Sequence, residues 1–344
     1  MSDEDKINSL FEGLILESEV SEDTQESEIE KNFRLLKERK QEELRQDILA
    51  GKKVYVLERG YYFPDFKKLR NHSVDPYLSV RKLSDPLEIH QPEFVREAIE
   101  YVKESLPHAH KAVDALASSD LMRLEFGRST SFRPVLLVGP PGCGKSTLVR
   151  IFHQAFGYPS MSMNVGAMGD TLSFTGAHPT FGDAKPSVIA EFLAKTGTAN
   201  PCVILDEVDK SPEGGKFGAV KNALLQFLEP MESKKFRDIF LNAEINLSHV
   251  RWVMTANDLD SVPAPLKSRS HIVHVESPKR EHVPQLAKGM LRNFLEEVGL
   301  DIRWFRLDGI EEKILCENFR GDLRHLKNMV SIVLKEKMKS IHVC

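Results

Sequence analysis

The strongest constraint on the fold of this chain is a glycine-rich segment between a short apolar run and a helix-like stretch. Residues 135–138 (VLLV) are wholly apolar, as expected of a strand buried in a parallel sheet. The sequence GPPGCGKS at 139–146 fits the pattern G-x-x-x-x-G-K-[ST], and residues 145–156 have helical spacing. Such a loop surrounds a phosphate group with backbone N–H groups and a helix N-terminus. The segment therefore predicts an α/β fold with a phosphate-binding loop.

Two carboxylates end a second apolar run. Residues 203–205 (VIL) lead into Asp206 and Glu207, and Asp206 lies 61 residues after Lys145. At this distance from the loop, Asp206 is expected to hold Mg²⁺ through water, and Glu207 to orient and deprotonate the attacking water. A third run, 250–255, leads to Asn257, whose amide is expected to position that water. These residues predict the hydrolysis of a nucleotide.

The loop residues have predicted tasks of their own. Lys145 is expected to reach the outer phosphates, and Ser146 is expected to bind Mg²⁺ together with Asp206. We expect ATP and Mg²⁺ as ligands. The predicted nucleotide-binding residues are Gly139, Pro140, Pro141, Gly142, Cys143, Gly144, Lys145, Ser146, Thr147 and Asp206.

Strand-like and helix-like stretches alternate as far as Pro278. Further apolar runs occur at 161–165 and 272–275, and the alternation predicts a doubly wound parallel sheet. After Pro278 the character becomes helical throughout, which predicts an all-helical lid domain. The helical stretches are 281–298, 310–318 and 322–339.

The first 90 residues do not share this rhythm. Residues 1–30 are strongly acidic, which is typical of a disordered or solvated tail, and 28–50 have the spacing of a charged amphipathic helix. Residues 52–85 are aromatic and turn-rich, and a new helical pattern starts near Gln91, with Pro92 suited to a first helical position. The expected parts are 1–50 (acidic tail and charged helix), 51–90 (aromatic extension), 91–278 (α/β nucleotide-binding domain) and 279–344 (helical lid).

Composition argues against several classes of protein. The formal net charge is −4, whereas a protein that coats nucleic acid needs clustered Lys and Arg. The four cysteines and twelve histidines show no metal-ligand spacing, so we expect neither a structural metal nor a disulfide framework. No apolar run approaches the ~20 residues that cross a bilayer, and the N-terminus is not of the secretory kind. We therefore expect a cytoplasmic protein without a membrane partner.

With these motifs in place, the chain resembles the AAA+ ATPases, and within them the ATPase module of the Lon protease family. From residue 135 to about 278, GPPGCGKSTL resembles the family's Walker A motif and LDEVDK its Walker B motif. PMESKKFRDIFL, INLSHVRWVMTAND and LDSVPAPLKSR follow in the family's order. The resemblance implies that Asn257 is the sensor 1 residue and Arg269 the arginine finger, which acts on ATP held by the neighbouring subunit. It implies that Arg324, in RGDLRHLKNMV, is the sensor 2 residue, and that the chain forms a homo-oligomeric, hexameric ring.

The resemblance also concerns a polypeptide substrate. It places Phe181, in HPTFG, at the aromatic position that grips an extended polypeptide in the pore of such rings. Phe174 is a rival for this role, and Phe217 a second pore element. The family usually has an aliphatic residue where this chain has Gly182, which departs from the gripping pattern.

We expect an ATPase that remodels or unfolds proteins, as a chaperone does, without proteolysis of its own. The serine motif of the Lon peptidase (a Pro-Ser-Ala-Gly type) is absent from this sequence. Three other interpretations stay open. One is an AAA+ motor acting on nucleic acid, with modest basic clusters at 234–235 and 335–339. Another is a nucleotide-dependent switch or scaffold that binds a partner through the acidic N-terminus. The third is a component that works with a separate protease or a defence system.

Overall fold

A computed structural model describes residues 28–58, 60–64, 75–127, 132–168, 171–179, 184–210, 217–300, 303 and 305–341. Residues 1–50 and 51–344 form two compact units. In the first unit, helix α2 (Glu28–Leu49) has the predicted position, and Arg34 and Glu38 pair one turn apart along it (3.8 Å). The predicted acidic tail up to residue 27 lies outside the described residues.

A five-stranded parallel sheet forms the centre of the second unit, in the strand order β4-β5-β8-β3-β9. Each predicted apolar run forms one of these strands, with small shifts in its bounds, which confirms the predicted doubly wound parallel sheet. Because the strands are parallel, the segments that follow β3, β5 and β8 all leave from the same edge of the sheet. The strands are β3 (Val135–Val138), β4 (Ser160–Asn164), β5 (Cys202–Asp206), β8 (Arg251–Ala256) and β9 (His271–His274).

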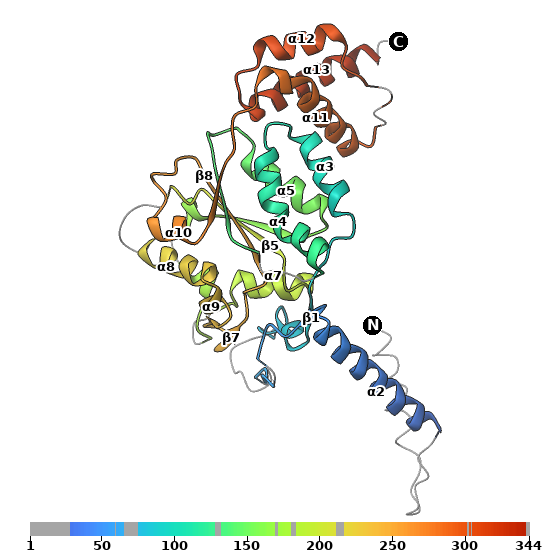
Figure 1. Ribbon diagram of the computed structural model, residues 1–344, viewed down its shortest axis with the longest axis vertical. Coiled ribbons are helices and arrows are strands. Elements are labelled where there is room, and N and C mark those ends of the chain that lie inside the picture. The colour runs from blue at the N-terminus through green and yellow to red at the C-terminus, as the bar shows by residue number, and fades with distance from the viewer. Residues whose placement is uncertain are drawn as a thin grey trace, which may run out of the picture. The chain divides into compact units, whose positions relative to one another are not determined.

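Helices cover both faces of the sheet, because successive side chains of a strand point to opposite faces. Leu137, Ile204 and Val253 pack into the core on one face. The helices on this face are α3 (Val95–Ser105), α4 (His110–Phe126) and α5 (Lys145–Ala155) (Figure 1). The helix expected from Pro92 thus begins at Val95 instead.

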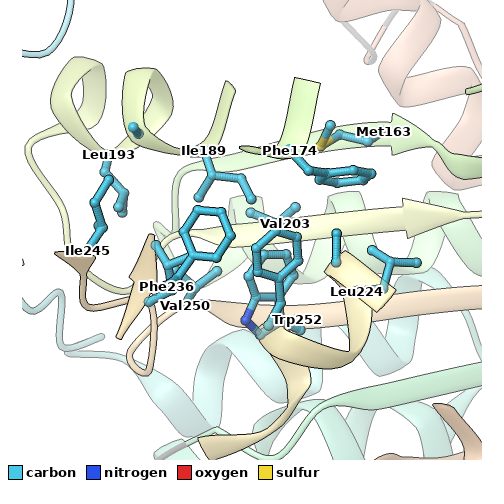
Figure 2. Close-up of a cluster of buried hydrophobic side chains, with 14 of the residues drawn as sticks. Met163, Phe174, Ile189, Leu193, Val203, Leu224, Phe236, Ile245, Val250 and Trp252 are labelled. Carbon is cyan, nitrogen blue, oxygen red and sulfur yellow. The ribbon is translucent and has the colours of Figure 1, made fainter. Parts of the chain in front are cut away.

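The opposite face carries a separate core. Figure 2 shows Ile189 and Leu193 directed toward the strand that carries Val203. Trp252 stacks on the ring of Phe227, with centroids 4.9 Å apart. The helices on this face are α6 (Leu172–Thr175), α7 (Val188–Thr196) and α8 (Phe217–Leu228).

The aromatic segment after residue 50 shares this second core. Tyr77 is buried against Phe240 (ring centroids 4.9 Å apart), and the Tyr61 hydroxyl donates to the Leu241 carbonyl (2.6 Å). Burial of Phe63 and Tyr77 explains part of the aromatic content of this stretch, whereas Tyr62 is exposed. The elements involved are β1 (Lys53–Val54), the 3₁₀ helix η2 (Arg81–Ser84), β2 (Leu87–Glu88) and the hairpin of β6 (Phe236–Asp238) and β7 (Ala243–Ile245).

Three long helices follow residue 278, as predicted for the lid. Asp308 caps one of them, because its side chain accepts from the backbone N–H groups of Ile310 and Glu311. No helix in the described part of the chain has the length and apolar character needed to cross a membrane. The helices are α11 (Val283–Glu297), α12 (Gly309–Asn318) and α13 (Leu323–Ile341), and the short elements are η3 (Val165–Ala167), α9 (Pro230–Ser233), α10 (Ala264–Ser268) and η4 (Arg280–His282).

Candidate active site

The glycine-rich loop joins β3 to α5 at the edge of the sheet where the strands end. Gly142 (φ 80°) and Gly144 (φ 97°) adopt left-handed backbone conformations that favour glycine. At Gly139 an added Cβ would collide with the carbonyl oxygen of Val275. Cys143 is fully buried, and burial raises the pKa of its thiol, so we assign it a packing role rather than a nucleophilic one. The loop therefore has the backbone shape that the sequence predicts for holding phosphate.

Lys145 is a buried cation whose hydrogen-bond acceptors among the described residues are all neutral. Lys145 is only 8% exposed, and its Nζ donates to the carbonyl oxygens of Gly139 (2.6 Å) and Pro140 (3.1 Å). It also donates to Oδ1 of Asn257 (3.0 Å), which joins two predicted site residues. No carboxylate in the described part of the chain forms an ion pair with Lys145. Because an unpaired buried charge is unfavourable, this position favours an anionic ligand.

Asp206 ends β5 and accepts three hydroxyl hydrogen bonds. Ser146 Oγ and Thr255 Oγ1 donate to its Oδ1, each at 2.8 Å. Ser162 Oγ donates to Oδ2 (2.6 Å). The structure thus brings together Ser146 and Asp206, the two predicted Mg²⁺ residues. A hydroxyl and a carboxylate are the oxygen ligands that suit this ion.

Glu207 follows Asp206 in a left-handed backbone conformation (φ 61°). Its Oε1 accepts from Lys210 Nζ (2.6 Å) and its Oε2 from Asn164 Nδ2 (3.4 Å). The hydrogen bond from Lys210 is the main cause that holds the pKa of this carboxyl below its ordinary value. Glu207 is therefore ionised near neutral pH, as a general base must be.

A cleft of about 830 Å³ opens beside these side chains, a size suited to a nucleotide. The loop, Asp206, Glu207 and Asn257 line one side of it, and helices α11 and α13 of the lid line the other. The lid contacts the loop directly, because Leu323 N donates to the carbonyl oxygen of Gly142 (2.9 Å). The lining includes Pro141, Gly142, Gly144, Lys145, Ser146, Thr147, Leu286, Met290, Phe294, Leu323 and Arg324.

The two predicted arginines lie in different places. Arg324 is exposed on α13 and lines the cleft. Arg269 directly follows α10 and is not among the residues that line the cleft. Its Nε pairs with Oε2 of Glu229 (3.1 Å), and both side chains are about one-third exposed. The structure thus gathers the loop, the acidic pair, Asn257 and Arg324 around one cleft, and leaves Arg269 apart.

The predicted pore aromatic cannot be placed, and one of its rivals is wrong. Phe181 lies outside the described residues. Phe174 is fully buried against Phe227 (ring centroids 5.6 Å apart), so it cannot grip a polypeptide. Phe217 is the first residue of α8, and its side chain lies outside the described part of the chain.

A buried carboxylate fixes the segments on either side of Phe181. Ala177 N donates to the carbonyl oxygen of Lys185 (3.0 Å), which brings the two ends of this stretch together. Asp238 has no exposed surface, and its Oδ2 accepts from Ser187 N (2.9 Å). The other oxygen accepts from Leu241 N (2.9 Å). These bonds form a clamp that joins Ala177 to Lys185 and ties Ser187 to the β6–β7 hairpin.

Sequence reasoning missed the side chains that hold the acidic pair. Ser162 and Asn164 lie two residues apart on β4, so they face the same side of the sheet. Thr255 carries a hydroxyl directly after the apolar run 252–254 of β8, two residues before Asn257. Polar residues at such positions were the available signal, but their partners could be named only once the strand order was known.

Residues 135–277 match the family described as "ATPase family associated with various cellular activities (AAA)". The match begins with β3, includes the loop, the acidic pair, Asn257 and Arg269, and ends before the lid. Residues 135–277 form an AAA domain.

The relatives of this AAA domain include Lon proteases. One from Desulfovibrio desulfuricans is 34% identical over 208 residues, covering 59% of this chain and 23% of the relative. Another from Mesomycoplasma hyopneumoniae is 29% identical over 291 residues, covering 83% of this chain and 32% of the relative. The mitochondrial Lon protease homologue of Mus musculus is 29% identical over 259 residues, covering 74% and 26%. The chain spans less than a third of the length of these relatives.

Proposed function

We propose that this chain binds and hydrolyses Mg²⁺-ATP in the cleft between its AAA domain and its lid. The observation that carries the proposal is Lys145, a buried cation that lies at the base of a phosphate-binding loop and has no anionic partner among the described residues. A phosphate group supplies the missing negative charge, and the loop supplies backbone donors for its oxygens. Residues 139–147 would hold the phosphates, and Arg324 would reach them from the lid.

Ser146 and Asp206 would hold Mg²⁺. Their oxygens lie 2.8 Å apart, and Ser162 and Thr255 fix the orientation of the carboxylate. When bound, the ion neutralises charge on the β- and γ-phosphate oxygens.

Glu207 is the residue to which we assign the proton transfer. The attacking water gives its proton to the Glu207 carboxylate while its oxygen bonds to the γ-phosphorus, and the bond from that phosphorus to the bridging oxygen of ADP breaks. The carboxylate stands beside Asp206 at the end of β5, on the same edge of the sheet as the loop. Asn257, from the neighbouring strand, would orient the water through its side-chain amide.

The assembly we propose is a ring of copies of this chain, with six as the expected number. Arg269 lies away from its own cleft, which supports a role at the cleft of a neighbouring copy. A guanidinium brought to the γ-phosphate in this way stabilises the charge that develops there during hydrolysis.

The work done by the cycle would be the remodelling or unfolding of a polypeptide, with Phe181 as the gripping residue. Similarity to Lon proteases supports this substrate class. Because these 344 residues contain no Lon-type serine motif, we assign them ATP hydrolysis and not peptide cleavage.

The first test is steady-state ATP hydrolysis by the purified chain, alone and with an unfolded polypeptide or DNA. Stimulation by the polypeptide that is lost in Phe181→Ala is the expected result. Stimulation by DNA alone would contradict the polypeptide substrate and favour a motor that acts on nucleic acid. A basal rate that neither additive changes would favour a nucleotide-dependent switch.

The matched control is Glu207→Gln, which keeps the size of the side chain and removes the base. We expect ATP binding, measured with a fluorescent analogue, to stay unchanged while turnover falls by about 10²-fold or more. Near-normal turnover in this variant would remove Glu207 from the mechanism.

A further inference from the structure

We propose that Asp209 is a positioning residue that sets the place of Asn257 in the active site. The inference rests on the proposed role of Asn257 in hydrolysis. Asp209 lies three residues after Asp206, on the turn that leaves β5. It does not itself line the cleft, so any effect on the reaction passes through another residue.

Two backbone hydrogen bonds join Asp209 to the segment after β8. Its Oδ2 accepts from Asn257 N (2.9 Å) and from Asp258 N (3.1 Å). The side chain of Asn257 in turn accepts from Lys145 Nζ (3.0 Å). Asp209, Asn257 and Lys145 therefore form one continuous chain of hydrogen bonds that ends at the predicted phosphate-binding cation.

The position of Asn257 needs this support because the sheet no longer provides it. The pairing of β8 with β3 ends at Ala256, and its pairing with β5 ends at Met254. Asn257 N is thus the first donor beyond the ladder, and Asp209 accepts from it as a neighbouring strand would. The turn that carries Asp209 is itself held, since Val208 N donates to the carbonyl oxygen of Thr255 (3.0 Å).

The second carboxylate oxygen indicates what Asp209 contributes. Its Oδ1 is buried and has no hydrogen-bond partner among the described residues. The contribution of Asp209 is therefore one oxygen acceptor at a fixed place, and the negative charge is not required for it. An asparagine can supply the same acceptor, and its amide nitrogen would take the place of an oxygen that bonds to nothing.

The test compares Asp209→Asn with Asp209→Leu, which has a similar shape and no acceptor. We expect Asp209→Asn to keep the wild-type kcat within about threefold. We expect Asp209→Leu to lower kcat by about 10- to 100-fold, because a small misplacement of a reacting group has effects of this size. The dissociation constant for the fluorescent ATP analogue should change far less than kcat, since the loop and Ser146 are untouched.

A double-mutant cycle separates positioning from a general loss of structure. In an Asn257→Ala background, Asp209→Leu should produce no further loss of kcat, because the group that it positions is already gone. A full additional loss in that background would overturn the proposal, as would Asp209→Asn being as slow as Asp209→Leu. If Asp209→Leu does not fold, Asp209→Ser in the same cycle carries the test.

The two proposals fail in different ways. An Asn257→Ala variant with normal kcat would contradict the role of Asn257 itself. If Asn257→Ala has a low kcat while a folded Asp209→Leu keeps the wild-type kcat, only the positioning role of Asp209 is contradicted.

Discussion

Glu207 adopts a backbone conformation that its residue type avoids. A non-glycine residue with φ near 61° is destabilised by roughly 1–2 kcal/mol relative to an ordinary conformation. Two hydrogen bonds to Thr255 hold the turn in place: Glu207 N donates to Thr255 Oγ1 (3.2 Å), and Val208 N to its carbonyl oxygen (3.0 Å). The sequence LDEVDK contains no sign of this conformation, because it depends on a contact with a strand almost 50 residues later.

Lys210 gives a prediction for the pH dependence of the reaction. Its hydrogen bond lowers the pKa of Glu207, so the ionised base persists to lower pH than it otherwise would. In Lys210→Met that pKa rises, and the acid limb of the kcat profile should move to higher pH while the plateau persists. The measurement is kcat from about pH 4 to 8 at saturating ATP, with Lys210→Arg as the control that keeps the charge. An acid limb that does not move in Lys210→Met would show that Lys210 does not control this base.

At the scale of elements, the N-terminus of α13 lies against the phosphate-binding loop. Asp322 Oδ1 accepts from Arg324 N (2.6 Å) and His325 N (3.4 Å), so Asp322 caps the helix. A Cβ added to Gly142 would overlap the carboxylate of Asp322, and one added to Gly144 would lie 2.5 Å from Leu323 Cδ1. Glycines in this loop therefore permit contact with the lid as well as with phosphate.

The cap gives a prediction for the stability of the lid. Asp322→Ala removes the acceptor, which should destabilise the first turn of α13 by about 1 kcal/mol, whereas Asp322→Asn retains it. Hydrogen exchange of the α13 amides measures this locally, and we expect about fivefold faster exchange in Asp322→Ala alone. Equal exchange in the two variants would show that the side chain does not cap the helix.

The sequence predicted the elements that are determined by local hydrophobic spacing. It did not predict features that depend on contacts between distant segments. The strands of the parallel sheet and the helices of the lid follow from apolar runs and helical periodicity. The packing of Tyr77 on Phe240 did not follow, since it joins segments more than 150 residues apart. The start of α3 at Val95 shows that Pro92 lies in the irregular segment before the helix and not at its first position.

At the scale of the whole molecule, the active site of one chain is incomplete under the proposed mechanism. The loop, Asp206, Glu207 and Asn257 surround one cleft, while Arg269 is paired with Glu229 outside it. The sequence located Arg269 through family resemblance alone, because no local pattern distinguishes a finger from an ordinary surface arginine. Under the proposed mechanism, Arg269 acts on the nucleotide only at the cleft of a second copy of the chain.

Mixing two inactive variants tests this arrangement. Arg269→Ala chains keep an intact loop, and Lys145→Ala chains keep an intact finger. We expect each to be inactive alone, and mixed assemblies to regain part of the ATPase activity, because some clefts then combine both intact halves. The measurement is ATP turnover across mixing ratios, with mixing verified by subunit exchange of labelled chains. No recovery in verified mixed assemblies would exclude a finger supplied by a neighbour.

The clamp of Ala177, Lys185, Ser187 and Asp238 holds the main chain through its own hydrogen bonds, whatever residues stand between its ends. Because the hydrogen bonds of Ala177, Lys185 and Ser187 hold the main chain at both ends, we expect residues inserted between these ends to leave the sheet unchanged. Asp238 anchors the clamp through both carboxylate oxygens, so its loss would release Ser187 and Leu241 together.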